Sequence, residues 1–156
     1  MSDIGTGIGA AIPRVEDYRL LTGQGQYSDD FSHPDQVFAV MVRSPHAHAE
    51  LFGINIDRAN AVPGVLAVLT GVDWVSDRLK PMPAWGNPKD VELRNRDGSN
   101  IFYTPLYPVA VDRIRRAGEI VAVVVAETEP QARDAAETIQ IDCKLLDTVT
   151  DGVEAM

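Results

Sequence analysis

The sequence predicts a soluble domain of the α+β class, built from a mixed sheet and two or more helices. Three observations indicate this class. Several apolar runs have the length of strands, one segment near the C-terminus has the period and the capping residues of a helix, and two of the strand-like runs flank that helix. A strand, a helix and a strand joined by short turns indicate a split βαβ arrangement, which is typical of α+β domains.

The first predicted strand covers residues 37–43. It is apolar nearly throughout, so we expect both of its faces to be covered. Pro45 ends it, because proline cannot donate to a strand ladder. Residues 51–56 alternate well enough to form a second strand. A short helix is expected over residues 58–62, with Asp57 as its N-cap and a proline and a glycine at its end.

Residues 65–69 predict a third, buried strand, and residues 72–108 then have no persistent period. This long segment is rich in proline and holds both tryptophans. So long a loop in a compact domain is typical of a functional, mobile or partner-contacting segment. Asp97-Gly98 inside it could turn a hairpin, although the flanking residues are poor strand formers.

A central, valine-rich strand is expected over residues 119–126, and Thr128 begins the best-defined helix. Thr128 and Gln131 form a capping box, and Pro130 is tolerated in the first turn. One narrow stripe of small apolar residues follows, made of Ala132, Ala135, Ala136 and Ile139. Because these side chains are small, we expect the helix to lie close against a sheet. Residues 140–145 predict the last strand.

Composition limits the classes of function. The chain has 156 residues, and its net charge of −9 opposes docking on nucleic-acid phosphates or an anionic membrane. Cys143 is the only cysteine, which excludes an internal disulfide and a cysteine-rich metal or iron–sulfur site. No signal peptide or membrane span is evident, so we expect a cytoplasmic protein. The expected layout is an arm over residues 1–12 and one domain over 13–150, with the insertion at 72–108.

His46 and His48 are the first candidates for metal chemistry. On a strand, residues two apart face the same way, so both imidazoles could reach one ion. A zinc site needs three or four ligands, and His33 is the only other histidine. The favoured interpretation is that Ser44-Pro45 makes a turn and that the imidazoles hydrogen-bond to nearby backbone.

Two further patterns favour structural roles. Gly5-Thr-Gly-Ile-Gly9 is similar to a nucleotide-binding loop but lacks the strand before it and the helix after it. The acid pairs Glu16-Asp17 and Asp29-Asp30 could support acid–base chemistry if burial separated their pKa values. Their turn-rich surroundings favour capping and turn roles instead.

The remaining reactive side chains also carry no assigned chemistry. Cys143 is expected to be a small buried apolar residue, since a nucleophile would need a histidine base beside it. The only dense basic cluster is expected to be either a solvated rim or a contact for an acidic partner, and it consists of Arg113, Arg115 and Arg116. We therefore assign no catalytic, cofactor-binding or metal-binding residue.

Four blocks of sequence occur in an order that resembles a known family. They are Leu21-Thr-Gly-Gln-Gly-Gln-Tyr27, Arg43-Ser-Pro-His-Ala-His-Ala49, Pro63-Gly-Val-Leu-Ala-Val-Leu-Thr-Gly71 and Val125-Ala-Glu-Thr128 with Gln131-Ala-Arg-Asp-Ala-Ala-Glu137. Together they resemble the N-terminal α/β hammerhead domain of the molybdenum-binding large subunit in the xanthine dehydrogenase, aldehyde oxidase and aerobic carbon monoxide dehydrogenase family. The spelling is most similar to that of carbon monoxide dehydrogenase-type subunits.

The resemblance implies a non-catalytic domain of a molybdenum-dependent oxidoreductase, as a fragment or a split subunit with a structural and subunit-docking role. In that family the catalytic glutamate and the pterin contacts lie in later domains, to which nothing here corresponds. The whole enzyme would use molybdopterin, with iron–sulfur clusters and FAD on other domains or subunits. Those domains and subunits would be its partners, and a homo-oligomer is a further option. The alternative is a free-standing protein-binding module without enzyme activity.

Two departures from the family pattern lie near the edges where the domain would meet its neighbours. Arg116-Ala-Gly-Glu-Ile-Val-Ala122 stands where the family usually has Tyr-Val-Gly-Glu-Pro-Val-Ala. Asp142-Cys-Lys-Leu-Leu-Asp147 stands in place of a typical Asp-Tyr-Glu-Pro-Leu-Pro. These departures concern the fit to neighbouring domains and not the fold.

Overall fold

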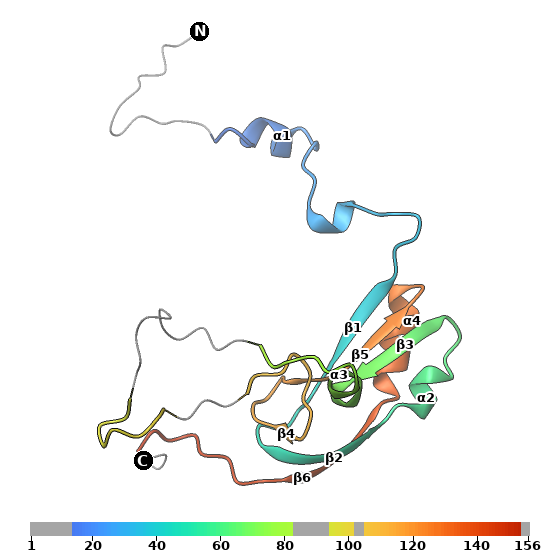
Figure 1. The fold of residues 1–156 in the computed structure, drawn as a ribbon. Helices are drawn as coiled ribbons and strands as arrows, with labels where there is room; N and C mark the ends of the chain where they lie inside the picture. The colour runs from blue at the N-terminus through green and yellow to red at the C-terminus, as the bar shows by residue number, and fades with distance from the viewer. Residues whose placement is uncertain (1–13, 83–93, 102–104, 154–156) are drawn as a thin grey trace, which may run out of the picture. The chain divides into compact units, whose positions relative to one another are not determined.

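The structure is a computed structural model that describes residues 14–82, 94–101 and 105–153. The chain divides into two units, Met1–Gln36 and Val37–Met156, and each is described by itself (Figure 1). The first unit contains the short helix α1 (Asp17–Leu21) and the 3₁₀ turn η1 (Ser28–Asp30), and neither has a buried residue. No helix in the described part of the chain is long and apolar enough to cross a membrane.

The second unit contains two sheets of three strands. One sheet has the order β1-β5-β3, with β1 at Phe38–Arg43, β5 at Ile120–Ala126 and β3 at Val65–Thr70. The other has the order β4-β2-β6, with β4 at Arg113–Ile114, β2 at Ala49–Asn55 and β6 at Gln140–Leu145. Every strand pair in the two sheets is antiparallel.

The α+β class is confirmed. The strands form two antiparallel sheets instead of a mixed sheet, and the expected split βαβ arrangement is wrong. The two strands that flank the C-terminal helix, β5 and β6, pair in different sheets, so the helix does not connect parallel neighbours. The same holds for β2 and β3, which flank a shorter helix. Strands that are distant in the sequence pair here in antiparallel fashion. The spacing of neighbouring elements along the sequence does not reveal such partners.

The helix α4 (Glu129–Glu137) begins as predicted. Thr128 is its N-cap, and the backbone N–H of Thr128 donates to Gln131 Oε1 at 3.0 Å. Ala132 and Ala135 are fully buried and belong to a core with Val124 and other residues of the first sheet. Because alanine side chains are small, α4 packs closely on β1 and β5, as Figure 1 shows.

A second core lies under the other sheet. Its fully or almost fully buried members are Ala49, Ala110, Ile114 and Val121. β5 contributes to both cores, through Val121 in this one and Val124 in the other. The prediction of a central strand in this part of the chain is therefore confirmed. Cys143 is partly buried and packs against this second core, with Leu51 as its strand partner.

Two expectations about burial are wrong. β1 alternates between half-buried and exposed residues, and its Met41 keeps 45% of its surface exposed. β3 alternates in a similar way, and Leu69 remains 46% exposed. α4 packs on β1 and β3 from the face that carries Val124 and Val68, whereas Met41 and Leu69 belong to the other face. An apolar run therefore indicates a strand here without indicating cover on both sides.

The short helix α2 also begins differently from the prediction. It covers Asp57–Asn60, so Asp57 is its first residue and Ile56 occupies the N-cap position. The backbone N–H of Asp57 donates to Asn55 Oδ1 at 3.1 Å. The side chain before the helix thus satisfies a helix N–H, which is the role that the sequence had suggested for Asp57.

The segment 72–108 is not wholly irregular. Helix α3 (Gly71–Ser76) opens it, with Asp73 Oδ2 accepting from the Thr70 backbone N–H at 2.7 Å. It ends at Ser76 with Asp77 as its C-cap, and Arg78 after it has a left-handed φ of 58°. The Leu79 N–H then donates to the Trp74 carbonyl. Further along, Arg94 and Asn100 form an isolated bridge around the predicted turn, where Gly98 has a φ of 83°. The Ser99 side-chain hydroxyl and backbone N–H lower the pKa of Asp97 there.

Candidate functional site

The segment from Ser44 to His48 connects β1 to β2 and is not part of a strand. The backbone N–H of His46 donates to Ser44 Oγ at 3.0 Å, and Ser44 Oγ in turn donates to the His46 carbonyl. His48 Nδ1 lies 2.7 Å from the Asp147 carbonyl oxygen, so it donates a proton to that acceptor. The predicted turn at Ser44 is confirmed.

His48 holds the chain that follows β6. Besides the imidazole contact, the Leu146 backbone N–H donates to the His48 carbonyl at 3.0 Å. The expected backbone partner of this imidazole is therefore present, but it lies 99 residues away in sequence. Within the described ranges no three residues of the metal-binding types gather at one place. The His48 imidazole bonds to a backbone carbonyl, whereas His46 takes part in the turn through its own backbone N–H and carbonyl.

The acid pairs lie on the first unit and serve local turns. Asp17 Oδ2 accepts from the Arg14 backbone N–H at 3.2 Å, and Asp30 Oδ2 accepts from the Tyr27 N–H at 2.8 Å. The predicted capping and turn roles are confirmed for these two carboxylates. The glycine-rich block at residues 5–9 lies outside the described residues.

Two arginines of the basic cluster form ion pairs with nearby acids. Arg115 reaches Asp112 Oδ1 at 3.4 Å, and Arg116 lies 4.0 Å from Glu119 Oε1. Glu119 itself is only 5% exposed, and its Oε2 accepts from the Arg115 backbone N–H at 2.6 Å. This arrangement stabilises the turn before β5, and we assign no reaction to it.

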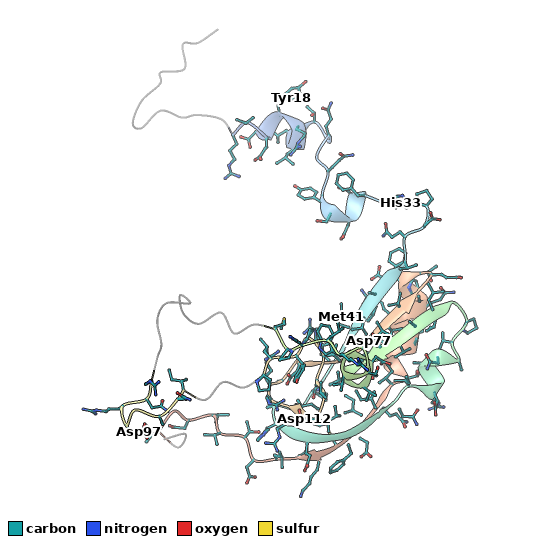
Figure 2. All side chains as sticks on the ribbon, in the orientation of Figure 1. Tyr18, His33, Met41, Asp77, Asp97 and Asp112 are labelled. Carbon is teal, nitrogen blue, oxygen red and sulfur yellow. The ribbon has the colours of Figure 1, made fainter. Side chains whose placement is uncertain are left out.

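The feature that sequence reasoning missed is an open apolar face on the first sheet. A depression of about 340 Å³ lies on it and is lined by residues of β1, β3, β5 and α3 and of the adjoining loops, among them Met41, Leu69, Trp74, Leu79 and Val123. Figure 2 labels Met41 and Asp77, which both line it. One sequence pattern could have indicated part of this face. Thr70 lies three residues before Asp73, and this spacing is typical of a helix N-terminus, so it predicts that Trp74 lies in a helix.

Trp74 has an unusual environment within this depression. Its indole Nε1 is buried and has no hydrogen-bond acceptor in the part of the chain that the structure describes. Buried polar groups in proteins are hydrogen-bonded as a rule, so such a group requires an explanation. The apolar lining makes the depression the strongest candidate for a binding surface, and this lining fits a protein segment better than a charged small molecule.

The comparisons with known proteins agree on one family. The model for the aldehyde oxidase and xanthine dehydrogenase a/b hammerhead domain matches residues 22–147. The chain is 37% identical to the nicotine 6-hydroxylase large subunit of Paenarthrobacter nicotinovorans, over 92% of this chain and 16% of that protein. It is 34% identical to the carbon monoxide dehydrogenase large chain of Afipia carboxidovorans, over 96% of this chain and 17% of that protein.

Solved structures support the same fold. A crystal structure of the Cu,Mo-CO dehydrogenase aligns with a TM-score of 0.78 at 33% identity, over 96% of this chain and 17% of that one. Quinoline 2-oxidoreductase from Pseudomonas putida 86 aligns with a TM-score of 0.74 at 36% identity, over 92% of this chain and 17% of that one.

The match confirms the resemblance that the ordered sequence blocks predicted. The chain spans only 16% of the first of these relatives and 17% of the second, so it corresponds to one domain-sized part of an oxidoreductase large subunit. The chain belongs to the aldehyde oxidase and xanthine dehydrogenase family and has the α/β hammerhead fold.

Proposed function

We propose that the chain is the non-catalytic N-terminal domain of a molybdenum hydroxylase large subunit, as a fragment or a split subunit, and that its role is structural and subunit-docking. The observation that carries the proposal is the family match over residues 22–147, together with the small share of the relatives' length that the chain covers. The open apolar face supports it, because such faces in soluble proteins are typical of contacts with other domains.

The donor atoms of the chain are consistent with cofactors that lie elsewhere. Cys143 is its only cysteine, whereas the iron–sulfur clusters of such enzymes need several thiolates. We place molybdopterin, the iron–sulfur clusters and FAD on other domains or subunits of the enzyme, in the cytoplasm. We also propose an arm over residues 1–12 and one folded domain over 13–150, with residues 72–108 as an insertion.

Co-expression tests the proposal. The tagged chain is produced together with the polypeptide from the same genome that corresponds to the unmatched part of the relatives. We expect the two to co-purify and the molybdenum to follow the partner polypeptide, as measured by elemental analysis. The chain purified alone is the control, and it should hold no molybdenum. If the chain alone bound molybdopterin or oxidised an aldehyde or an N-heterocycle, the proposal would be wrong.

A further inference from the structure

Strand β6 is the outer strand of the second sheet. It pairs with β2 on one side, and no strand in the described part of the chain pairs with its other side (Figure 1). An edge strand presents N–H and C=O groups that can pair with a further strand. The residues of β6 indicate which strand fits this edge.

The backbone groups of Cys143 face the open edge. Leu51 lies opposite Cys143 on β2, and its N–H donates at 3.0 Å to the carbonyl of Asp112, next to β4 on the far side of β2. Leu51 and Cys143 are therefore a non-hydrogen-bonded pair, in which the N–H and C=O of each residue point away from the other strand. Ile141 and Leu145 present their backbone groups to the open edge as well, because alternate residues of a strand share this direction.

The side chains of β6 are arranged symmetrically about Cys143. Ile141 and Leu145 lie two residues before and after it and share its side of the strand, and Leu145 is 62% exposed. Asp142 and Lys144 lie one residue before and after it on the opposite side, and both are exposed. Within the described ranges neither charge has an ion-pair partner. The strand is thus complementary to a second copy of itself.

We propose that two copies of this chain associate through β6, in antiparallel fashion about a two-fold axis at Cys143. Leu145 of each copy then lies opposite Ile141 of the other, and Asp142 lies opposite Lys144. The two charges occupy a non-hydrogen-bonded position, where the Cα atoms are about 4.5 Å apart and the side chains are closest. The axis repeats each contact, and the two second sheets become one continuous antiparallel sheet.

Neighbouring registers do not fit in this way. An axis moved by one residue would place Asp142 opposite itself or Lys144 opposite itself, and like charges in that position are destabilising. An axis between two residues would place a residue that faces the open edge opposite one that faces β2. A lysine on an edge strand usually opposes pairing with other chains. Here the acid two residues before it matches it in a single register.

Two of these residues depart from the family pattern. Lys144 and Leu145 stand where the typical run has glutamate and proline. A glutamate at position 144 would face Asp142 of the other copy as a like charge, and a proline at position 145 would have no N–H to donate across the edge. The association therefore depends on residues that distinguish this chain, and it does not depend on the proposed function.

Charge reversal tests the register. Asp142→Lys and Lys144→Asp each place like charges opposite one another at both repeats of the contact, so each should weaken dimerisation of the full chain about tenfold. An equimolar mixture of the two variants should form a heterodimer about as strongly as the unmodified chain dimerises, because opposite charges face each other again. Sedimentation velocity over a concentration series measures all four samples.

Asp134→Lys is the matched control for charge. Asp134 is exposed on α4, which packs on the first sheet, and its reversal changes the net charge by the same amount as Asp142→Lys. Since each copy carries −9, this reversal should leave dimerisation unchanged or strengthen it slightly. Lys144 lies opposite Glu50 on β2, whereas Asp142 lies opposite a glycine, so thermal unfolding is compared for both strand variants.

Leu145→Pro tests the backbone pairing without a change of charge. The N–H of residue 145 faces the open edge, so proline removes no hydrogen bond to β2 and is tolerated on an edge strand. It removes a bond across the axis at both repeats and should weaken dimerisation about tenfold. The thermal midpoint of the dilute, monomeric chain should stay close to that of the unmodified chain.

The outcomes separate this inference from the proposed function. A chain that stays monomeric at every concentration overturns the inference and leaves the proposed function intact, because that function is measured by co-purification with another polypeptide. A dimer that the three β6 variants leave unchanged shows that another surface joins the copies, which also overturns the inference. A mixture of the charge variants that does not restore association overturns the register.

Discussion

At the residue scale, Glu119 shows how a buried carboxylate can stabilise a turn. Its side chain accepts from the Arg115 backbone N–H, and its own carbonyl accepts from Ser44 N–H at 2.9 Å. Gly118, the residue before Glu119, has a φ of 79°. The Arg43 side chain donates to the Gly118 carbonyl at 2.8 Å. The turn before β5 is thus joined to the end of β1 through its backbone carbonyls, and the carboxylate stabilises the turn itself.

Glu119→Ala should lower the free energy of unfolding by about 1–3 kcal/mol, because it leaves the Arg115 N–H without its acceptor. Glu119→Gln keeps an acceptor oxygen of the same reach and should cost less than half as much. Chemical denaturation of the two variants measures the difference. Equal losses would contradict the hydrogen-bond explanation and indicate that charge or packing is responsible.

At the element scale, α3 lies unusually close to the chain around residues 110 and 111. A Cβ added at Gly71, the first residue of α3, would lie 2.2 Å from the Ala110 carbonyl oxygen and 2.8 Å from Val111 Cα. Both neighbours are backbone atoms, which cannot move without shifting the chain. Glycine at this position is therefore required by close approach and not by its own dihedral angles.

Gly71→Ala should destabilise the chain by about 1–3 kcal/mol through overpacking. Gly53→Ala on β2 is the matched control, since no atom lies within 4 Å of its added Cβ. That control should be neutral or slightly stabilising, because alanine restricts the unfolded chain more than glycine does. The comparison uses thermal or urea unfolding, and a loss at Gly53 as large as that at Gly71 would contradict it.

At the scale of the whole molecule, the two units differ in how much they bury. No described residue of the segment 14–36 is buried, and Val15, Tyr18, Leu21, Tyr27 and Phe31 expose most of their surface. The second unit contains both hydrophobic cores. Since burial of apolar surface is the main source of folding free energy, we expect the stability of the chain to come from the second unit.

Removal of residues 1–36 should therefore change the thermal midpoint by less than about 3 °C, which corresponds to roughly 0.8 kcal/mol for a domain of this size. Circular dichroism should show the sheet signal retained. A fall of 8 °C or more, on the order of 2 kcal/mol, would contradict the expectation. Deletion of residues 1–13 alone is a suitable control for the effect of shortening the chain.

Local elements could be predicted from the sequence because their causes lie within a few residues. The capping box of Thr128 and Gln131 and the alanine stripe behind it both depend on spacing within one helix. Helix α3 was missed because it has only six residues and its capping acid is an aspartate. The family could also be predicted, because several ordered blocks match together and residues 22–147 fit its model.

By itself, then, the sequence determined where β1, β5, α4 and β6 lie and which family the chain belongs to. Only the tertiary structure decided that the strands divide into two sheets, that α4 covers one face of the first sheet and not the other, and that Trp74 Nε1 is buried without an acceptor among the described residues. The physical reason is the distance along the sequence between the residues that interact. Periodicity records which side chains are apolar, but whether a helix covers them depends on contacts between residues that are far apart in the chain.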